Sequence, residues 1–243
     1  MQFANIQWQE SMNSTDTPYS IDFDDIYFST DDGLQETEYV FIEHNQLKQR
    51  FKAFSENTFC IAETGFGTGL NFLVVASHWL ALAPITAKLR FISIEKHPLR
   101  LDDLIKALEA WPQFSEIANT IISQYAQLKT GCNHFTFANN RIELQLYIGD
   151  VTEVLPSLQI ADGTFVNAWL LDGFAPTKNA EMWSLDTLQH MARISSKGTT
   201  FATFTSAGIV RRNLEAKGFH VEKHAGYGKK REMLAGYFGE YFW

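Results

Sequence analysis

A glycine-rich turn between a predicted strand and a predicted helix constrains the fold of this chain more than any other feature. Residues 59–71 read Phe-Cys-Ile-Ala-Glu-Thr-Gly-Phe-Gly-Thr-Gly-Leu-Asn: an apolar run, a carboxylate, three alternating glycines and the start of an apolar helix. Glycine lets the backbone adopt positive φ and approach a ligand closely, because no Cβ intervenes. A strand-to-helix crossing also leaves free amide donors at the start of the helix. The turn therefore predicts a nucleoside-type cofactor at the carboxyl edge of an α/β sheet.

The composition describes one folded domain that buries a large core. The chain has 243 residues, of which 45% are hydrophobic and only 6 are proline. No run approaches the ~18 consecutive apolar residues of a membrane span, and the first residues lack the basic start and apolar block of a signal peptide. The two cysteines, Cys60 in a predicted strand and Cys132 in a predicted loop, are too few for a disulfide framework. We therefore expect a cytoplasmic protein that does not bind membranes.

The net charge of −8 argues against binding of nucleic acid by the whole surface. The charge is uneven, however, because residues 208–233 carry seven basic and three acidic side chains. This segment is therefore +4 and leaves −12 for the rest of the chain. The distribution predicts a local basic face on an acidic body. The seven histidines are scattered, and His220 and His224 merely share one face of a predicted strand, so we expect no metal site.

From residue 59 onward, apolar strand-like runs alternate with helix-like segments. The predicted strands are residues 59–62, 89–94, 142–148, 165–171 and 199–204, and the predicted helices are residues 69–83, 99–111, 114–128, 180–194 and 208–217. Residues 219–224 and 233–238 read as a closing hairpin-like pair. This alternation is typical of a doubly wound, mostly parallel α/β sheet with helices on both faces. We expect this unit to span residues 58–243. Residues 1–57, with a strand-like segment at 38–42, then form a small β-rich N-terminal extension packed on the core.

Four carboxylates fall at the ends of four successive predicted parallel strands. They are Glu63, Glu95, Asp150 and Asp172. In an open α/β sheet, the carboxyl ends of the strands meet at one crevice, where ligands bind. Any one of these acids, taken alone, also reads as a solvated loop residue. Together with the glycine turn, the four acids predict one ligand site at this edge of the sheet.

The spacing of the glycines separates two classes of cofactor. A dinucleotide fold has G-x-G-x-x-G with an acid about 20 residues later, whereas this chain has G-x-G-x-G with Glu95 about thirty residues later. The pattern resembles the Rossmann-like class I S-adenosylmethionine-dependent methyltransferases. The resemblance implies a seven-stranded sheet with a reversed last strand, with Glu95 on the ribose hydroxyls and Asp150 on the adenine amino group. The cofactor-binding residues that it implies are Glu63, Gly65, Phe66, Gly67, Gly69, Asn71, Glu95, Lys96, Asp150 and Asp172.

Five segments in order narrow the resemblance. They are residues 23–29 (Phe-Asp-Asp-Ile-Tyr-Phe-Ser), 63–72 around the glycines, 171–176 (Leu-Asp-Gly-Phe-Ala-Pro), 204–212 (Phe-Thr-Ser-Ala-Gly to two arginines) and 226–233 (Gly-Tyr-Gly-Lys-Lys-Arg-Glu-Met). Together they resemble the methyltransferase part of the bacterial tRNA 5-methylaminomethyl-2-thiouridine biosynthesis proteins. In that family, the methyltransferase is often fused to a C-terminal FAD-dependent oxidoreductase. This chain has no second glycine fingerprint, so FAD and oxidoreductase activity are expected only in a fused or partner domain.

The resemblance implies S-adenosylmethionine-dependent methylation of 5-aminomethyl-2-thiouridine at the tRNA wobble position. The primary amine of this nucleoside is mostly protonated in water, so the enzyme must bind it neutral or take its proton. Asp172 is the candidate for orienting the amine and accepting that proton, with a purely positional role as the alternative. The acid is followed here by Gly-Phe-Ala-Pro. This departs from the wider pattern of amino-methyltransferases and leaves the roles of Phe174 and Pro176 open.

The remaining site residues each have a functional and a structural interpretation. Tyr27 and Phe28 wall the pocket and stack on the uracil, or they pack the N-terminal extension. Asn71 reaches the methionine carboxylate or is a plain first-turn residue, and Lys96 contacts the cofactor or is a solvated rim residue. The basic residues are candidate phosphate contacts with tRNA, or they form an ordinary solvated face. They are Arg211, Arg212, Lys229, Lys230 and Arg231.

Two rival functions stay open, because fold alone does not determine the substrate. One is a methyl- or aminopropyl-transferase of the same fold that acts on a small cationic amine, which an acidic surface suits. The other is a non-catalytic RNA-binding module that kept the fold. The intact strand-end acids and glycine turn argue against the second rival.

Overall fold

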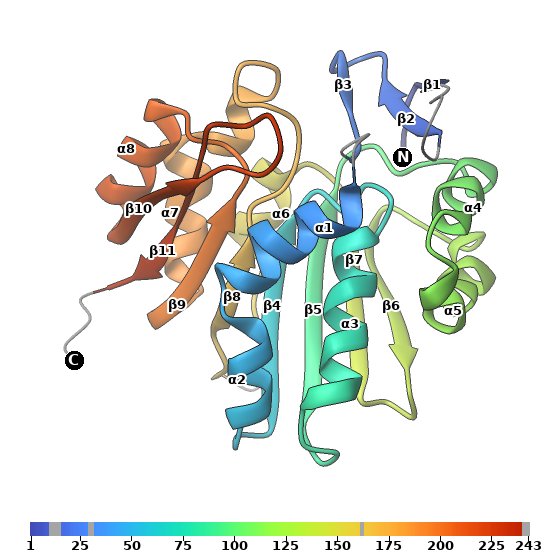
Figure 1. Ribbon diagram of the computed structural model, residues 1–243, viewed down its shortest axis with the longest axis horizontal. Helices are drawn as coiled ribbons and strands as arrows, with labels where there is room; N and C mark the ends of the chain where they lie inside the picture. The colour runs from blue at the N-terminus through green and yellow to red at the C-terminus, as the bar shows by residue number, and fades with distance from the viewer. Residues whose placement is uncertain (10–15, 29–31, 161–162, 240–243) are drawn as a thin grey trace.

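The computed structural model describes residues 1–9, 16–28, 32–160 and 163–239. Ser29, the last residue of the first sequence motif, lies outside these ranges. The main feature of the structure is an eight-stranded sheet in the order β10-β11-β9-β8-β4-β5-β7-β6 (Figure 1). Within the described ranges, no helix has the length and apolar character needed to cross a bilayer.

The centre of the sheet is parallel. Its strands are β4 (Thr58–Thr64), β5 (Lys88–Glu95), β7 (Ile142–Ile148), β8 (Val166–Leu170) and β9 (Ser195–Thr203). β11 (Glu232–Phe238) is antiparallel to both β9 and β10 (Phe219–Ala225), which confirms the reversed last strand and the closing hairpin. The chain adds strands in one direction from β4 to β7 and then returns to the other side of β4 with β8. This change of direction is where open α/β sheets bind ligands.

Alternate residues of the central strands face opposite layers of helices. In β4, Phe59 and Ile61 join one apolar cluster, and Cys60 and Ala62 join another, as the two-residue period of a strand requires. The first cluster includes side chains of α2 (Leu47–Ala53), α3 (Leu70–Leu82), α4 (Leu101–Glu109) and α5 (Ser115–Tyr125). The second includes side chains of α6 (Val151–Ser157), α7 (Leu185–Arg193) and α8 (Gly208–Ala216). Short 3-10 turns at Pro112–Phe114 and Ala180–Trp183 precede α5 and α7. The predicted helices on both faces are therefore confirmed.

The sheet has one strand more than the seven that the resemblance implies. β6 (Gly131–Phe137) pairs antiparallel with β7 at the edge of the sheet, where the sequence analysis places Cys132 in a loop. Asn133, Phe135 and Phe137 are buried, and the intervening residues are more exposed. A strand with one polar face is typical of an antiparallel edge. The additional strand leaves the class I methyltransferase architecture unchanged.

The N-terminal extension is only partly β. The strands β1 (Ile6–Gln9), β2 (Thr17–Ser20) and β3 (Asp25–Ile26) form a small antiparallel sheet beyond the carboxyl ends of the parallel strands (Figure 1). Residues 38–42, predicted as a strand, lie instead in a π-helical segment, Glu38–Glu43, between α1 (Gly33–Thr37) and α2. Three consecutive apolar residues there are buried. This segment packs on several sides, so its continuous apolar run reflects burial rather than a strand.

Candidate active site

A cavity of about 540 Å³ opens at the carboxyl ends of the central strands. Its walls come from the loops after β4, β5, β7 and β8, and from three distant segments, residues 23–28, 33–41 and 227–230. A cavity of this size suits an organic ligand the size of a nucleoside. Glu95, Asp150 and Asp172 line it, as the strand-end pattern predicts. Glu63 is only 1% exposed and lies outside the lining.

The glycine turn offers its backbone directly to the cavity. Gly65, Gly67 and Gly69 have φ angles of +99°, +53° and +79°, in the range that glycine adopts at little cost. A Cβ on Gly65 would lie 3.3 Å from the carbonyl oxygen of Asp172. Gly65, Phe66 and Gly67 line the cavity, whereas Gly69 is the N-cap of α3. The turn therefore brings main chain, rather than side chains, to the position of a ligand.

Two acids at adjacent strand ends line one side of the cavity. Glu95 accepts hydrogen bonds from the amides of Gly67 at 2.9 Å and His97 at 2.7 Å, yet burial raises the pKa of its carboxyl. Burial also opposes the ionisation of Asp150, but an ion pair with Lys96 at 2.6 Å and bonds from the first turn of α6 lower its pKa overall. Lys96 is half exposed at the rim. Both acids keep acceptor capacity for hydroxyl or amino donors.

Asp172 follows β8 and is held by hydrogen bonds on both carboxylate oxygens. Oδ1 accepts from the Gly173 amide at 2.8 Å, and Oδ2 accepts from Asn71 Nδ2 at 2.7 Å. The main-chain carbonyl of Asp172 accepts from the Thr64 hydroxyl at 2.9 Å. Burial raises the pKa of the carboxyl to about 6, although both side-chain bonds lower it. A carboxylate with this pKa is suited to accept a proton near neutral pH.

A buried network fixes Asn71 and, through it, Asp172. The Nδ2 group of Asn71 donates to Glu63 Oε1 at 2.9 Å as well as to Asp172. Its Oδ1 accepts from the Thr37 hydroxyl at 2.9 Å. The other oxygen of Glu63 accepts from Ser93 at 2.6 Å, and burial raises the pKa of Glu63 well above its usual value. Because the side-chain amide of Asn71 forms its hydrogen bonds with protein groups, the network favours a positioning role for this residue.

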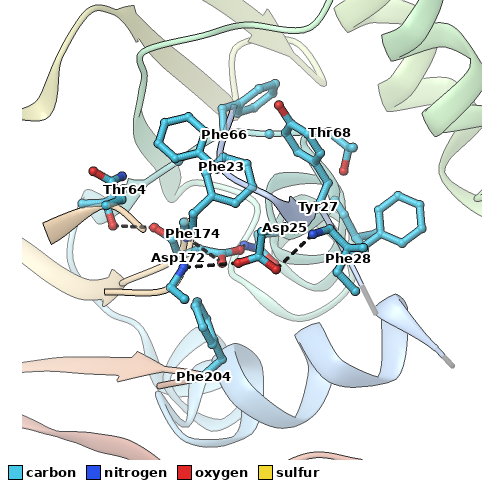
Figure 2. Close-up of a pocket in the computed structure, with 18 of the residues that line it drawn as sticks. Phe23, Asp25, Tyr27, Phe28, Thr64, Phe66, Thr68, Asp172, Phe174 and Phe204 are labelled. Atoms are coloured by element: carbon cyan, nitrogen blue, oxygen red, sulfur yellow. Dashed lines mark hydrogen bonds between the residues drawn. The ribbon is translucent and has the colours of Figure 1, made fainter. Parts of the chain in front are cut away.

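Aromatic rings wall the part of the cavity beside Asp172. Phe23 stacks on Phe174 with ring centroids 4.4 Å apart, and Tyr27 meets Phe174 edge-on at 5.4 Å. In Figure 2, these three rings lie on one side of Asp172, and the ring of Phe204 lies on the other. An aromatic chamber of this kind suits the ring of a nucleobase.

Strand β3 is joined by a hydrogen bond to the loop after β8. The Ala175 amide donates to Asp25 Oδ2 at 3.4 Å. Phe28 lines the cavity and also meets Trp111 edge-on at 5.8 Å, so its wall and packing roles coexist. Pro176 follows Ala175 but does not belong to the cavity lining within the described residues.

The candidate phosphate contacts divide into two groups. Lys229 and Lys230, in the loop between β10 and β11, line the cavity, and Arg231 is exposed next to them. Arg211 and Arg212 are exposed on α8, outside the lining, and Arg211 pairs with a glutamate one turn along the helix at 3.0 Å. The structure therefore brings the lysines to the cavity and leaves both arginines on the helix surface.

Several cavity residues escape prediction from the sequence. Glu36 and Thr37, on α1, line the cavity although no motif includes them. Phe23 and Phe204 occur in motifs, but nothing in the sequence gives them a role at the site. Their contacts join segments far apart in the chain, and only the fold brings such segments together.

Residues 112–238, just over half of the chain, match a protein family described as S-adenosyl-L-methionine-dependent methyltransferase. The chain belongs to this family. The methyltransferase fold, the glycine turn after β4 and the strand-end acids thus agree with the family match. The expectation of a class I S-adenosylmethionine-dependent methyltransferase is confirmed.

Relatives with known names resemble this methyltransferase along nearly all of its length. It is 47% identical to the tRNA 5-methylaminomethyl-2-thiouridine biosynthesis bifunctional protein MnmC of Methylobacillus flagellatus, over 97% of this chain and 35% of the relative. It is 50% identical to the protein of the same name from Pseudoalteromonas atlantica, over 96% of this chain and 33% of the relative. The chain thus spans about a third of the length of these relatives. The crystal structure of MnmC2 from Aquifex aeolicus has the same fold, with a TM-score of 0.75 and 20% identity, covering 96% of this chain and 70% of that one.

The site of this methyltransferase fits S-adenosyl-L-methionine. The glycine turn is a cradle that side chains would fill, because a Cβ on Gly67 would lie 3.2 Å from the Tyr27 ring. Glu95 ends β5, and Asp150 lies two residues after the paired strand β7, so two acceptors suited to hydroxyl or amino donors lie at neighbouring strand ends. Glu95, Asp150 and the turn would hold the cofactor, which supplies the methyl group when bound.

We expect turnover of this methyltransferase to fall as the pH drops through about 6. Protonation of Asp172 removes the proton acceptor, and burial places its pKa at about 6. Turnover at saturating substrate should therefore fall about tenfold per pH unit below this value. Above it, turnover should change less, except where the substrate amine itself titrates. Initial rates between about pH 5 and pH 8 test this expectation. A profile without an inflection near the pKa of Asp172 would contradict its role as a base.

Proposed function

We propose that this chain transfers a methyl group from S-adenosyl-L-methionine to the primary amine of 5-aminomethyl-2-thiouridine at the tRNA wobble position. The product is 5-methylaminomethyl-2-thiouridine. The observation that carries the proposal is the identity of 47–50% with proteins named for the biosynthesis of this nucleoside, over 96–97% of the chain. The cavity supports it, because a proton-accepting carboxylate lies between aromatic walls at the cofactor edge of the sheet.

The residues of the cavity have separate tasks in this reaction. The acceptor arrives mostly as an ammonium, which has no lone pair, so its proton must leave before nitrogen can attack. Asp172 accepts that proton at a carboxylate oxygen, and the bonds from Asn71 and Gly173 hold the oxygens in place. The rings of Phe23, Phe174 and Tyr27 stack on or border a base that has left the anticodon stack. Holding the reacting atoms in line supplies much of the rate.

The basic residues suit the phosphates of the same substrate. Lys229, Arg231, Arg211 and Arg212 are exposed on the side of the fold formed by α8 and the β10–β11 hairpin. Phosphate contacts provide affinity and position, whereas the cavity selects the base.

The proposal also places the reaction in the cytoplasm. An FAD-dependent oxidoreductase, fused or separate, is the proposed partner, because the named relatives are bifunctional and this chain matches about a third of each.

A second candidate is methyl or aminopropyl transfer to a small cationic amine. It is favoured by the carboxylates of Asp25, Glu36 and Asp172, which line the cavity in addition to those of Glu95 and Asp150. A non-catalytic RNA-binding module has no such support, because three of the strand-end acids and two glycines of the turn line the cavity.

Methyl transfer with labelled S-adenosyl-L-methionine distinguishes these functions. We expect label in tRNA that carries 5-aminomethyl-2-thiouridine, released on digestion as 5-methylaminomethyl-2-thiouridine, and no label in tRNA with unmodified 2-thiouridine. Label in spermidine or putrescine, and none in the modified tRNA, would support the second candidate. Thermal unfolding with and without S-adenosyl-L-methionine provides the control for cofactor binding. Stabilisation by the cofactor without transfer to either substrate would contradict both candidates.

A further inference from the structure

The ammonium group of Lys230 lies inside the cavity that the acceptor amine would enter. Its Nζ is 2.7 Å from Glu36 Oε1 and 4.4 Å from the centroid of the Phe204 ring. Lys230, Glu36 and Phe204 all line the cavity together with Asp172. The charges of Glu36 and Lys230 both act on the Asp172 carboxyl, the first raising its pKa and the second lowering it. The lysine and the proposed proton acceptor therefore line the same cavity.

The surroundings of this ammonium form a general subsite for a primary amine. A carboxylate provides a charge-assisted hydrogen bond, and an aromatic face attracts a cation. The end of a lysine side chain is a methylene group followed by an ammonium, which is also the chemistry of an aminomethyl substituent. The ammonium of Lys230 thus contacts the Glu36 carboxylate and the Phe204 ring in the way that a protonated substrate amine would.

Glu36 lies on helix α1, and Lys230 lies in the loop between β10 and β11. The side chain of Glu36 is 16% exposed, against 45% for Lys230. Helix α1, which carries Glu36, is capped by Asp32 and joined to the loop by a second bond, from the Tyr227 hydroxyl to Gln35 at 3.3 Å. The loop therefore keeps a contact with α1 when the lysine side chain turns outward.

We propose that Glu36 and Phe204 form the ammonium-recognition subsite of the acceptor cavity, and that Lys230 occupies it until the substrate amine displaces it. The identity of that amine rests on the function proposed above. Exchange of one ammonium for another keeps the partly buried Glu36 carboxylate paired throughout. The displaced lysine reaches the solvent side of the loop, where a tRNA phosphate is available to it. An acceptor with a neutral or anionic substituent leaves Glu36 unpaired or repelled, so this subsite selects cationic acceptors.

Binding of benzylammonium, an aminomethyl group on a six-membered ring, tests the proposal without methyl transfer or tRNA. We expect Lys230→Gln to bind this probe about tenfold more tightly than the unchanged chain, because the internal competitor is gone. Glu36→Gln should lose the binding, and the double variant should not regain it. Lys223→Gln is the matched control, since Lys223 forms an ion pair of similar length, 2.8 Å with Glu232, on the same hairpin. It should leave the affinity unchanged.

The double variant separates recognition from general repulsion. If removal of any positive charge near the cavity were the cause, the gain from Lys230→Gln would persist in the presence of Glu36→Gln, and the proposal would be wrong. An unchanged affinity in Lys230→Gln would also overturn it. Lys230→Met provides a second neutral variant, and thermal unfolding verifies that each variant is folded. Failure of methyl transfer to tRNA alongside the expected binding pattern would refute the proposed tRNA substrate but not the subsite.

Discussion

The substitution Asp172→Asn is expected to lower turnover by about 10²–10⁴-fold, while affinity for S-adenosyl-L-methionine changes less than about threefold. Asparagine has almost the shape of aspartate but cannot accept the proton of the acceptor amine. The Gly173 amide still finds an oxygen partner, whereas the new amide NH2 group faces Asn71 Nδ2 and loses the hydrogen bond that Oδ2 accepted from it. Single-turnover rates and calorimetric titration with the cofactor measure the two quantities separately.

Asp25→Asn is the matched control for this prediction. Asp25 also lines the cavity and accepts hydrogen bonds from backbone amides, those of Ile26 at 3.0 Å and Ala175 at 3.4 Å. It belongs to β3 of the small N-terminal sheet and has no proposed part in proton transfer, so its variant should lose less than about tenfold in turnover. Equal losses of turnover and cofactor affinity in Asp172→Asn would assign Asp172 to cofactor binding. Similar turnover in the two variants would remove Asp172 from proton transfer.

The parts of the fold that the sequence predicts are those set by local, periodic signals. The central strands are buried on both faces and appear as apolar runs, and β4, β5, β7 and β8 each have an acid in their last two residues or within two residues after their end. The topology then follows from few rules, because parallel strands need crossovers of one hand. The sequence alone therefore predicts that Glu95, Asp150 and Asp172 lie at one edge of the sheet.

The missed strand β6 shows the limit of such local signals. Its alternation is clear once the pairing is known, with Phe135 and Phe137 buried, but Asn133 is buried too and interrupts the pattern. The side chain of Asn133 is satisfied by carbonyl oxygens, including that of Leu146 on the partner strand at 3.2 Å. A polar residue at an inward position is explained only by its partner, so this strand was not predictable from its own residues. Asn139 and Asn140, in the positive-φ turn before β7, were the available signal.

The acceptor side of the site was less predictable than the cofactor side. Glu36 and Lys230 are separated by 194 positions, and Thr37 and Asn71 by 34. Neither pair has a sequence spacing that a local rule could identify. The sequence places Lys230 in a basic run that suits phosphate, and the fold adds that its ammonium also lies against Phe204. Conversely, Asn71 at the helix start suits a ligand carboxylate by sequence, but its amide bonds to Glu63 and Asp172.

The substitution Gly65→Ala is expected to weaken cofactor binding by at least about tenfold and to lower turnover by about a hundredfold. Two effects combine at this position. The φ of +99° strains any residue with a Cβ, and the new methyl group would lie 3.3 Å from both the carbonyl oxygen of Asp172 and Cα of Gly173. These backbone atoms must move by a few tenths of an ångström. The movement displaces the proton acceptor and the turn that cradles the cofactor together.

Gly131→Ala is the control that separates the close backbone contact at Gly65 from the strain of a positive φ. Gly131 begins β6 with a similar φ of +87°, but a Cβ there meets nothing within 4 Å. Both variants should therefore lose stability through positive φ, by about 1–2 kcal/mol, and chemical denaturation measures this loss. Only Gly65→Ala should lose cofactor affinity, because only its Cβ presses on the loop that carries Asp172. If Gly131→Ala reduced cofactor binding equally, global destabilisation would account for both results, and the close approach at Gly65 would have no functional role.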